Sequence, residues 1–255
     1  MTSPGNAQWP ERPPDDKDRV IKELSEEKNS LLKIISHDIR GPFNQMFALL
    51  QLLELESKEI SSSYSAYFDK MYLAVIDGME MIRNLHDARS IDNGNIPLNF
   101  RPVGFQAVIL QSIRNFGILS RIKNITIVFN PAEPDREINT DKVLLGKVFD
   151  AVLSNAVKFS PPGSTVSVKV MREQGEVQAE ISDEGPGLKE NEIQDIFKKY
   201  QKLTPRPTLG EHTTGLGMYI AKAFTGMLGG VTHVSGTAKG GLCVQITLKD
   251  RIQDE

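Results

Sequence analysis

The chain has 255 residues, a net charge of −3, and a composition that is 39% hydrophobic and 25% charged. These values are typical of a soluble globular protein with room for two domains. They give no reason to expect binding to nucleic acid or to an anionic membrane surface, and no apolar run approaches the roughly 18 residues of a membrane span. Cys243 is the only cysteine, which excludes an intrachain disulfide, argues against a zinc site and fits a reducing, cytoplasmic location.

The N-terminal part of the chain predicts a tail followed by a long helix. Residues 1–17 are rich in proline and charge and are expected to form a disordered tail. Ile21, Leu24, Leu31 and Ile35 follow at the heptad spacing of helices that pair. Helical spacing of apolar residues continues to about residue 56, and a lone helix of this length would need a partner to cover its apolar stripe.

A second amphipathic helix follows a serine-rich break. Residues 64–91, "YSAYFDKMYLAVIDGMEMIRNLHDARSI", again carry apolar residues at helical spacing. We therefore expect an antiparallel helical hairpin over residues 18–92, with a linker over residues 93–97 that contains glycine, asparagine and proline. Because two helices bury little apolar surface, a homodimeric four-helix bundle is the expected assembly.

Residues 98–250 have a different sequence pattern, which predicts a second domain. Residues 251–255 are expected to be a short tail. Short, alternating, β-branched segments such as "STVSVKVM" and "EVQAEISD" predict strands. Helices are predicted between them over residues 104–122, 140–159 and 217–228. The mixture indicates an α+β chain with a C-terminal domain of layered sheet and helices.

Three segments of this domain contain residues suited to binding a ligand. Asn155 and Lys158 in "SNAVKF" lie three residues apart on one helix face; an amide oxygen suits Mg²⁺ and an ammonium suits phosphate, although such pairs are also common on solvated faces. In "ISDEGPGL", Asp183 ends a strand and can accept a hydrogen bond from an exocyclic amine. The glycines that follow would let the backbone approach a flat ligand, and a plain turn would have the same composition.

The third segment, "HTTGLGMYIAK", places Gly215 and Gly217 before a helix. A glycine turn that leads into a helix presents free N–H groups to an anion, but no Walker lysine follows. The preceding "TPRPTLGEH" is typical of a mobile lid or of an ordinary connecting loop.

The order of these segments resembles the ATP-binding domain of the GHKL superfamily. With "SHDIRGP" at residues 36–42, residues 18–249 resemble a two-component sensor histidine kinase. The resemblance implies a two-layer α/β sandwich of the Bergerat type and autophosphorylation from ATP and Mg²⁺. It also implies transfer of the phosphoryl group to an aspartate of a response-regulator receiver domain. No sensor segment is recognisable, so a sensor domain or sensory partner is expected elsewhere. The chain is expected to act in the cytoplasm, alone or as part of a larger, membrane-anchored protein.

The resemblance assigns roles residue by residue. His37 matches the phosphoacceptor, Asp38 its acidic neighbour and Arg40 another member of that box. The nucleotide-binding residues it implies are Asn155 (also the Mg²⁺ ligand), Lys158, Phe159, Asp183, Gly185, Gly187, Phe197, Tyr200, Thr214, Gly215, Leu216 and Gly217. A neutral imidazole with an ordinary pKa of about 6.5 suits a nucleophile, and a neighbouring carboxylate can stabilise its developing positive charge.

Three positions depart from the family pattern. Ala151 stands where a second asparagine is common, which would leave Mg²⁺ more dependent on Asn155, phosphate and water. Thr213 replaces a glycine at the lid hinge. Gly41 occupies the position where relatives with phosphatase activity usually carry Thr or Asn, so weak or absent phosphatase activity is expected. Two alternatives remain: another GHKL ATPase, or a scaffold or phosphotransfer dimer whose ATP site has decayed.

Overall fold

The computed structural model describes residues 43–54, 62–94, 96–201 and 203–249. In chain order the elements are a helix over residues 43–54, α2 (Ser62–Asp92), β1 (Arg101–Gly104), α3 (Phe105–Asn115), α4 (Gly117–Lys123), β2 (Thr126–Pro131), β3 (Glu137–Thr140), α5 (Lys142–Phe159), β4 (Thr165–Glu173), β5 (Glu176–Ser182), α6 (Glu190–Ile193), α7 (Gly217–Met227), β6 (Val231–Gly236) and β7 (Leu242–Lys249).

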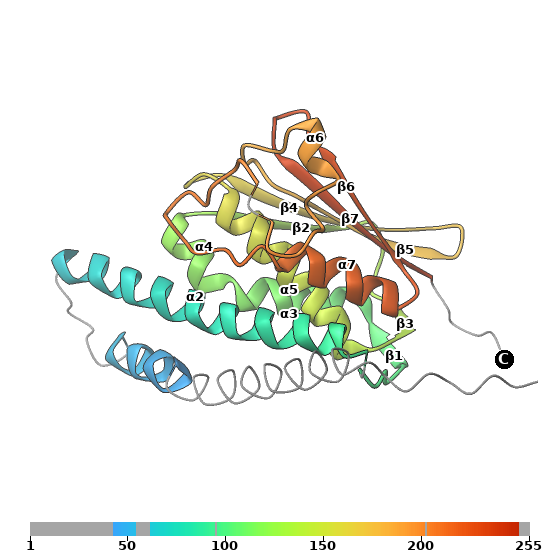
Figure 1. Ribbon diagram of the computed structural model, residues 1–255, viewed down its shortest axis with the longest axis horizontal. Helices are drawn as coiled ribbons and strands as arrows, with labels where there is room; N and C mark the ends of the chain where they lie inside the picture. Colours follow the sequence, from blue (N-terminus) through green and yellow to red (C-terminus); the bar gives the residue numbers. More distant parts are fainter. Residues whose placement is uncertain (1–42, 55–61, 95, 202, 250–255) are drawn as a thin grey trace, which may run out of the picture.

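A five-stranded sheet organises the C-terminal domain. Its strand order is β2-β4-β5-β7-β6, with β2 parallel to β4 and every other neighbouring pair antiparallel. β1 and β3 form a separate two-stranded sheet. Figure 1 shows α5 and α7 against one face of the larger sheet. This arrangement confirms the predicted α/β layer domain.

The core lies between the sheet and these helices. Alternate residues of the three central strands are buried because side chains of a strand point to opposite faces; the buried ones are Val166, Val168, Val170, Val177, Ala179, Ile181, Val244, Ile246 and Leu248. Helix α5 supplies a continuous buried stripe from Leu144 to Val157. Burial of this stripe holds the C-terminal end of α5 in place, where Asn155 and Lys158 lie.

Some local details differ from the sequence prediction. The single helix expected over residues 104–122 is two helices, because α3 ends at Asn115 and α4 begins at Gly117. Phe116 between them has φ −97° and ψ 7°, and the glycine that follows has a low helix propensity. The short elements β1, β3 and α6 were not predicted.

The helix over residues 43–54 packs antiparallel to α2. The Phe47 and Tyr72 rings meet edge to face with centroids 5.8 Å apart, and the Tyr72 hydroxyl donates to Glu54 at 2.8 Å. At the other end, Gly78 faces the Phe43 ring so closely that a Cβ there would lie 2.1 Å from it. These contacts show a helical pair over the described residues; the remainder of the expected hairpin, residues 18–42 and 55–61, lies outside them.

A second face of α2 lies along the C-terminal domain. Leu73, Ala88 and Ile91 of α2 belong to or pack against the main core, and α2 runs beneath the helical layer in Figure 1. At its other end, the pair of helices contacts α4, where Arg121 donates to Glu54 at 2.6 Å. The C-terminal domain is therefore docked along nearly the whole of α2.

Candidate functional site

Helix α5 positions the first group of site residues. Its N-terminus is capped by Asp141, whose carboxylate accepts from the amides of Val143 at 2.8 Å and Leu144 at 3.0 Å. Its last turn ends at Phe159, before the extended Ser160. Because the helix is capped at one end and buried along its length, Asn155 and Lys158 are presented from a rigid support.

A pocket opens beside this last turn, between α5, the end of β5, the segment before α7 and α2. Its lining residues are Glu80, Asn84, Val152, Asn155, Ala156, Phe159, Ile181, Asp183, Pro186, Gly187, Leu188, Ile196, Gln201, Leu203, Pro205, Arg206, Thr213, Thr214, Gly215, Gly217, Met218, Leu242 and Val244. The walls are mainly apolar, with a few polar groups from separate elements, which is the usual composition of a site for an organic ligand.

Asp183 is the buried carboxylate of this pocket. Its Oδ1 accepts from the amides of Gly185 at 2.8 Å and Leu242 at 3.1 Å. Burial raises the pKa of this carboxyl, and the two amides partly oppose the shift. No described residue donates to Oδ2, so this oxygen can accept from an amine of a ligand in the pocket.

At two positions around the pocket, the backbone conformation and the close approach of a neighbouring segment require glycine. Gly187 has φ +64°, and a Cβ there would lie 2.2 Å from the carbonyl oxygen of Gly240. Gly215 has φ +68°, and its Cβ would meet the backbone of Gln201 at 2.8 Å. Gly217 differs, because its Cβ would make only ordinary van der Waals contacts, with the Asn155 amide at 3.5 Å and the Ala151 carbonyl oxygen at 3.8 Å. Its hydrogen atoms leave space for a ligand next to Asn155 and the first turn of α7.

Lys158 turns away from the pocket and towards α2. Its ammonium donates to Asp77 at 2.9 Å and to the carbonyl of His212 at 3.0 Å, and it lies 3.0 Å from Glu80. Burial opposes the charge on this lysine, but the Glu80 and Asp77 carboxylates outweigh that effect and raise its pKa. In this docked arrangement the predicted phosphate contact is paired within the protein.

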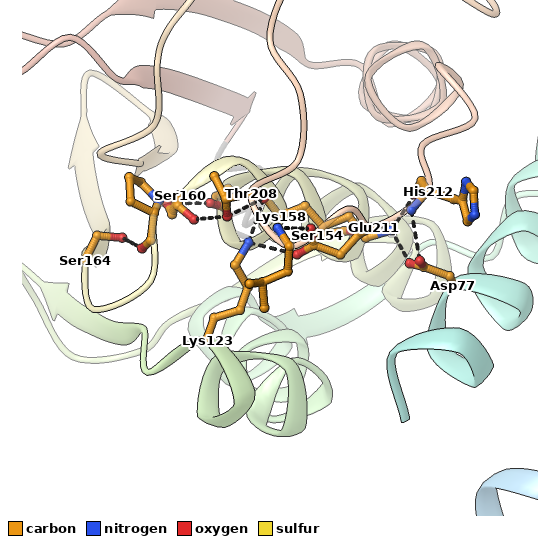
Figure 2. A network of polar contacts seen from close by, with 12 residues as sticks. Asp77, Lys123, Ser154, Lys158, Ser160, Ser164, Thr208, Glu211 and His212 are labelled. Atoms are coloured by element: carbon orange, nitrogen blue, oxygen red, sulfur yellow. Dashed lines mark hydrogen bonds and ion pairs between the residues drawn. The ribbon is translucent and has the colours of Figure 1, made fainter. Parts of the chain in front are cut away.

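The end of the lid-like segment is fixed by a second buried ammonium, shown in Figure 2. Lys123 donates to Glu211 at 2.8 Å and to the carbonyl of Lys158 at 2.7 Å, and neither side chain of the Lys123–Glu211 pair is exposed. Thr208 donates through its amide to the Lys158 carbonyl and through its hydroxyl to that of Ser160. Residues 208–211 are therefore anchored to the end of α5.

The structure brings together seven of the predicted nucleotide-binding residues at the pocket wall: Asn155, Phe159, Asp183, Gly187, Thr214, Gly215 and Gly217. Five others do not line it. Gly185 shapes the turn by donating to Asp183, Leu216 is in the core, and Lys158 points to α2. Phe197 lies under the Lys222 ammonium at 4.7 Å, and Tyr200 is 62% exposed. His37, Asp38 and Arg40 lie outside the described residues.

Several pocket residues were missed by sequence reasoning. Glu80 and Asn84 come from α2, where charged and polar residues on a helix are normally solvated. Arg206 is a cation inside the lid-like segment, which was a usable signal for a site that binds an anion. No group of three or more His, Cys, Asp or Glu side chains in the described part of the chain is placed to hold a metal ion.

Comparison with known proteins agrees with this geometry. Residues 140–252 match the family described as histidine kinase-, DNA gyrase B-, and HSP90-like ATPase. The chain is 26% identical over 239 residues to the sensor protein KdpD of Escherichia coli, covering 93% of this chain and 26% of KdpD. It is 28% identical over 214 residues to the ArcB homologue of Haemophilus influenzae, an aerobic respiration control sensor protein, covering 82% of this chain and 63% of that protein.

Solved structures show the same relationship. The mycobacterial sensor histidine kinase MprB superposes with a TM-score of 0.52 at 26% identity, covering 60% of this chain and 99% of that one. The chain contains a sensor histidine kinase catalytic domain. Full-length ShkA in complex with AMPPNP shares the fold with a TM-score of 0.61 at 22% identity, covering 86% of this chain and 45% of ShkA.

The chain spans less than two thirds of the length of the curated relatives it matches. No helix in the described ranges is both long enough and apolar enough to cross a membrane.

The contrast between two glycines gives a first prediction. Gly217→Ala should fold normally, because the new methyl meets its neighbours only at ordinary van der Waals distances of 3.5 Å or more, but it should weaken nucleotide binding by intruding beside Asn155. Gly215→Ala should instead destabilise the domain, because its φ is positive and a Cβ would strike the Gln201 backbone. Urea denaturation and calorimetric titration with an ATP analogue measure both effects. Equal destabilisation by the two substitutions would contradict this assignment.

The buried Lys123–Glu211 pair gives a second prediction. Glu211→Gln should destabilise the domain by about 3 kcal/mol or more, because it leaves a buried ammonium without its carboxylate. Burial lowers the pKa of Lys123 while Glu211 opposes that shift. Without the Glu211 carboxylate, the pKa of Lys123 in the folded state should fall further. Lys123 then loses its proton more readily in the folded than in the unfolded state, so the loss of stability should shrink as pH rises.

The double variant Lys123→Met with Glu211→Leu is the matched control. It removes both charges and retains side-chain volume, so its stability should lie close to that of the wild type. Urea denaturation between neutral and alkaline pH tests the pair; a deficit in Glu211→Gln that does not change with pH would argue against an unpaired lysine as its cause.

Proposed function

We propose that this chain is the transmitter part of a two-component histidine kinase. It binds Mg-ATP in the pocket at the end of α5, phosphorylates His37, and donates the phosphoryl group to an aspartate of a receiver domain. The observation that carries the proposal is the placement of this pocket: it is lined by the buried Asp183, whose Oδ2 accepts from no described residue, and it lies directly against α2, the second helix of the predicted phosphoacceptor hairpin.

The pocket residues fit an adenine nucleotide. Asp183 offers a carboxylate oxygen to the exocyclic amine, while Ile181, Val244 and Met218 supply apolar wall for the base. Towards the other end, Thr214, Gly215 and Gly217 lead into α7, whose first N–H groups have no intrahelical partner and can bind phosphate. Arg206 lines the same space from the lid-like segment and adds a positive charge.

Asn155 is the proposed Mg²⁺ ligand. Its amide makes no hydrogen bond within the described residues, and it lies at the pocket wall beside Gly217. Mg²⁺ often takes only one or two protein ligands and completes its shell with phosphates and water, so Ala151 at the position of a second asparagine is compatible with binding. When bound, Mg-ATP supplies the phosphoryl group and neutralises part of its charge.

The remaining parts of the proposal follow the resemblance. His37 precedes the first described residue, Phe43, by six positions; Asp38 would orient and stabilise its imidazole, and Arg40 belongs to the same box. The exposed apolar residues of the described helical pair, including Leu49, Leu52 and Leu53, support a homodimeric bundle. The chain would act in the cytoplasm under a sensor domain or sensory partner, with weak phosphatase activity because of Gly41.

The acceptor assignment is tested by labelling with γ-labelled ATP. The wild-type chain should acquire an acid-labile phosphoryl group, as expected of a phosphohistidine, and His37→Gln should lose it. His233→Gln is the matched control, because His233 is exposed on β6, and it should label normally. Undiminished or acid-stable label in His37→Gln would favour another GHKL kinase, and absence of ATP binding by the wild type would favour a scaffold.

Recognition of adenine is tested at Asp183. Because two amides hold Oδ1, the carbonyl oxygen of an Asp183→Asn variant should take that place and leave its NH₂ group at the position of Oδ2. This donor would face the adenine amine, so ATP binding should weaken at least about tenfold. Binding of ITP, which has a carbonyl there, should weaken less or improve. A parallel loss for both nucleotides would refute the proposed contact.

A further inference from the structure

Helix α2 carries two carboxylates into the part of the site expected to bind phosphate. Asp77 is 7% exposed and lies 2.9 Å from the Lys158 ammonium. Glu80, one turn later, lies 3.0 Å from the same ammonium, accepts from the Ser154 hydroxyl at 2.9 Å, and lines the pocket. Neither carboxylate belongs to the nucleotide-binding residues discussed above.

These contacts use the whole donor capacity of Lys158. A lysine ammonium has three N–H groups. Here it lies within hydrogen-bonding distance of three acceptors, on Asp77, Glu80 and the backbone carbonyl of His212. A nucleotide phosphate could therefore be bound by Lys158 only if at least one of these acceptors were displaced.

We propose that Asp77 and Glu80 are internal competitors of the nucleotide phosphates for Lys158. The inference rests on the proposed function, under which the pocket holds a nucleotide, and on the resemblance, which makes Lys158 a phosphate contact. A polyphosphate that entered the pocket would face Glu80 at the wall, and like charges repel strongly where water is excluded. Binding of a polyphosphate and docking of α2 at Lys158 therefore oppose each other, and by linkage each weakens the other.

The competition also extends to the lid-like segment. The other oxygen of Asp77 accepts from the backbone amide of His212 at 2.9 Å, as Figure 2 shows. The same carboxylate thus holds both Lys158 and residue 212, while Glu211 remains anchored by Lys123. Displacement of Asp77 by a phosphate would free Lys158 for the nucleotide and release this end of the segment in one step.

A second ion pair between α2 and the kinase domain provides a matched comparison. Asp87 is also 7% exposed and pairs with Lys147 at 2.5 Å, but neither residue lines the pocket. Asp87→Asn should loosen docking without removing a charge from the phosphate end. Comparing variants of the Lys158 pairs with a variant of the Asp87–Lys147 pair therefore distinguishes direct competition for Lys158 from a general loosening of the interface.

The test compares equilibrium binding of AMPPNP with Mg²⁺ and binding of adenosine in four proteins. These are the wild type, the double variant Asp77→Asn with Glu80→Gln, the single variant Glu80→Gln, and Asp87→Asn. The double variant should bind AMPPNP about tenfold more tightly than the wild type, Glu80→Gln should show a smaller gain in the same direction, and Asp87→Asn should gain less than the double variant. Adenosine, which has no phosphate, should bind nearly equally to all four.

Three results would overturn the inference: unchanged or weaker AMPPNP binding in the double variant, an equal gain for adenosine, or an equal gain in Asp87→Asn. If the double variant does not fold, as judged by its circular dichroism, Glu80→Gln decides, because its amide can still pair with Ser154. If AMPPNP binds to none of the four proteins, the proposed function itself fails, which is distinguishable from nucleotide binding that is insensitive to α2.

Discussion

The arrangement of this protein depends on pairing two ammonium groups that are buried at the end of α5. A buried lysine is costly unless carboxylates and carbonyls surround it. Lys158 meets this requirement with Asp77 and Glu80 of α2, and Lys123 with Glu211 of the lid-like segment. The two lysines are themselves connected, because Lys123 donates to the Lys158 backbone carbonyl. Helix α5, the segment before α7 and α2 are therefore joined by one polar network.

The consequence for the nucleotide pocket is that its two ends are built differently. The proposed base end is formed within the kinase domain, from Asp183, its two amide donors and the apolar ends of β5 and β7. This end does not require α2. The proposed phosphate end is lined by Glu80 of α2, and Lys158, the phosphate contact implied by the resemblance, is held away from the pocket by Asp77 and Glu80. Docking along the helix thus changes the electrostatics of one end of the pocket while leaving the other intact.

Helix α2 serves two partners with two faces, and this double use explains which residues could be recognised in advance. Its apolar face, with Tyr72 and Val75, packs against the helix over residues 43–54, and the heptad-like spacing predicted such a pairing. Its other face combines Leu73, Ala88 and Ile91 with Asp77, Glu80 and Asp87. A mixed face of this kind has the sequence pattern of a solvated helix surface, so nothing in the spacing indicated that two of its carboxylates are buried.

The site residues that the sequence alone predicted are those that belong to short motifs along the chain. Asp183 ends a strand and precedes a turn, Asn155 lies on a helix, and Gly215 and Gly217 lead into a helix; the order of these segments carried the resemblance that predicted their proximity. Tertiary structure alone decided where the long side chains point and which surfaces are covered. Lys158 faces α2, Phe197 and Tyr200 stay outside the pocket wall, and Arg206 lines it. These outcomes depend on contacts between residues as far apart as Asp77 and His212, and such contacts leave no periodic trace along the chain.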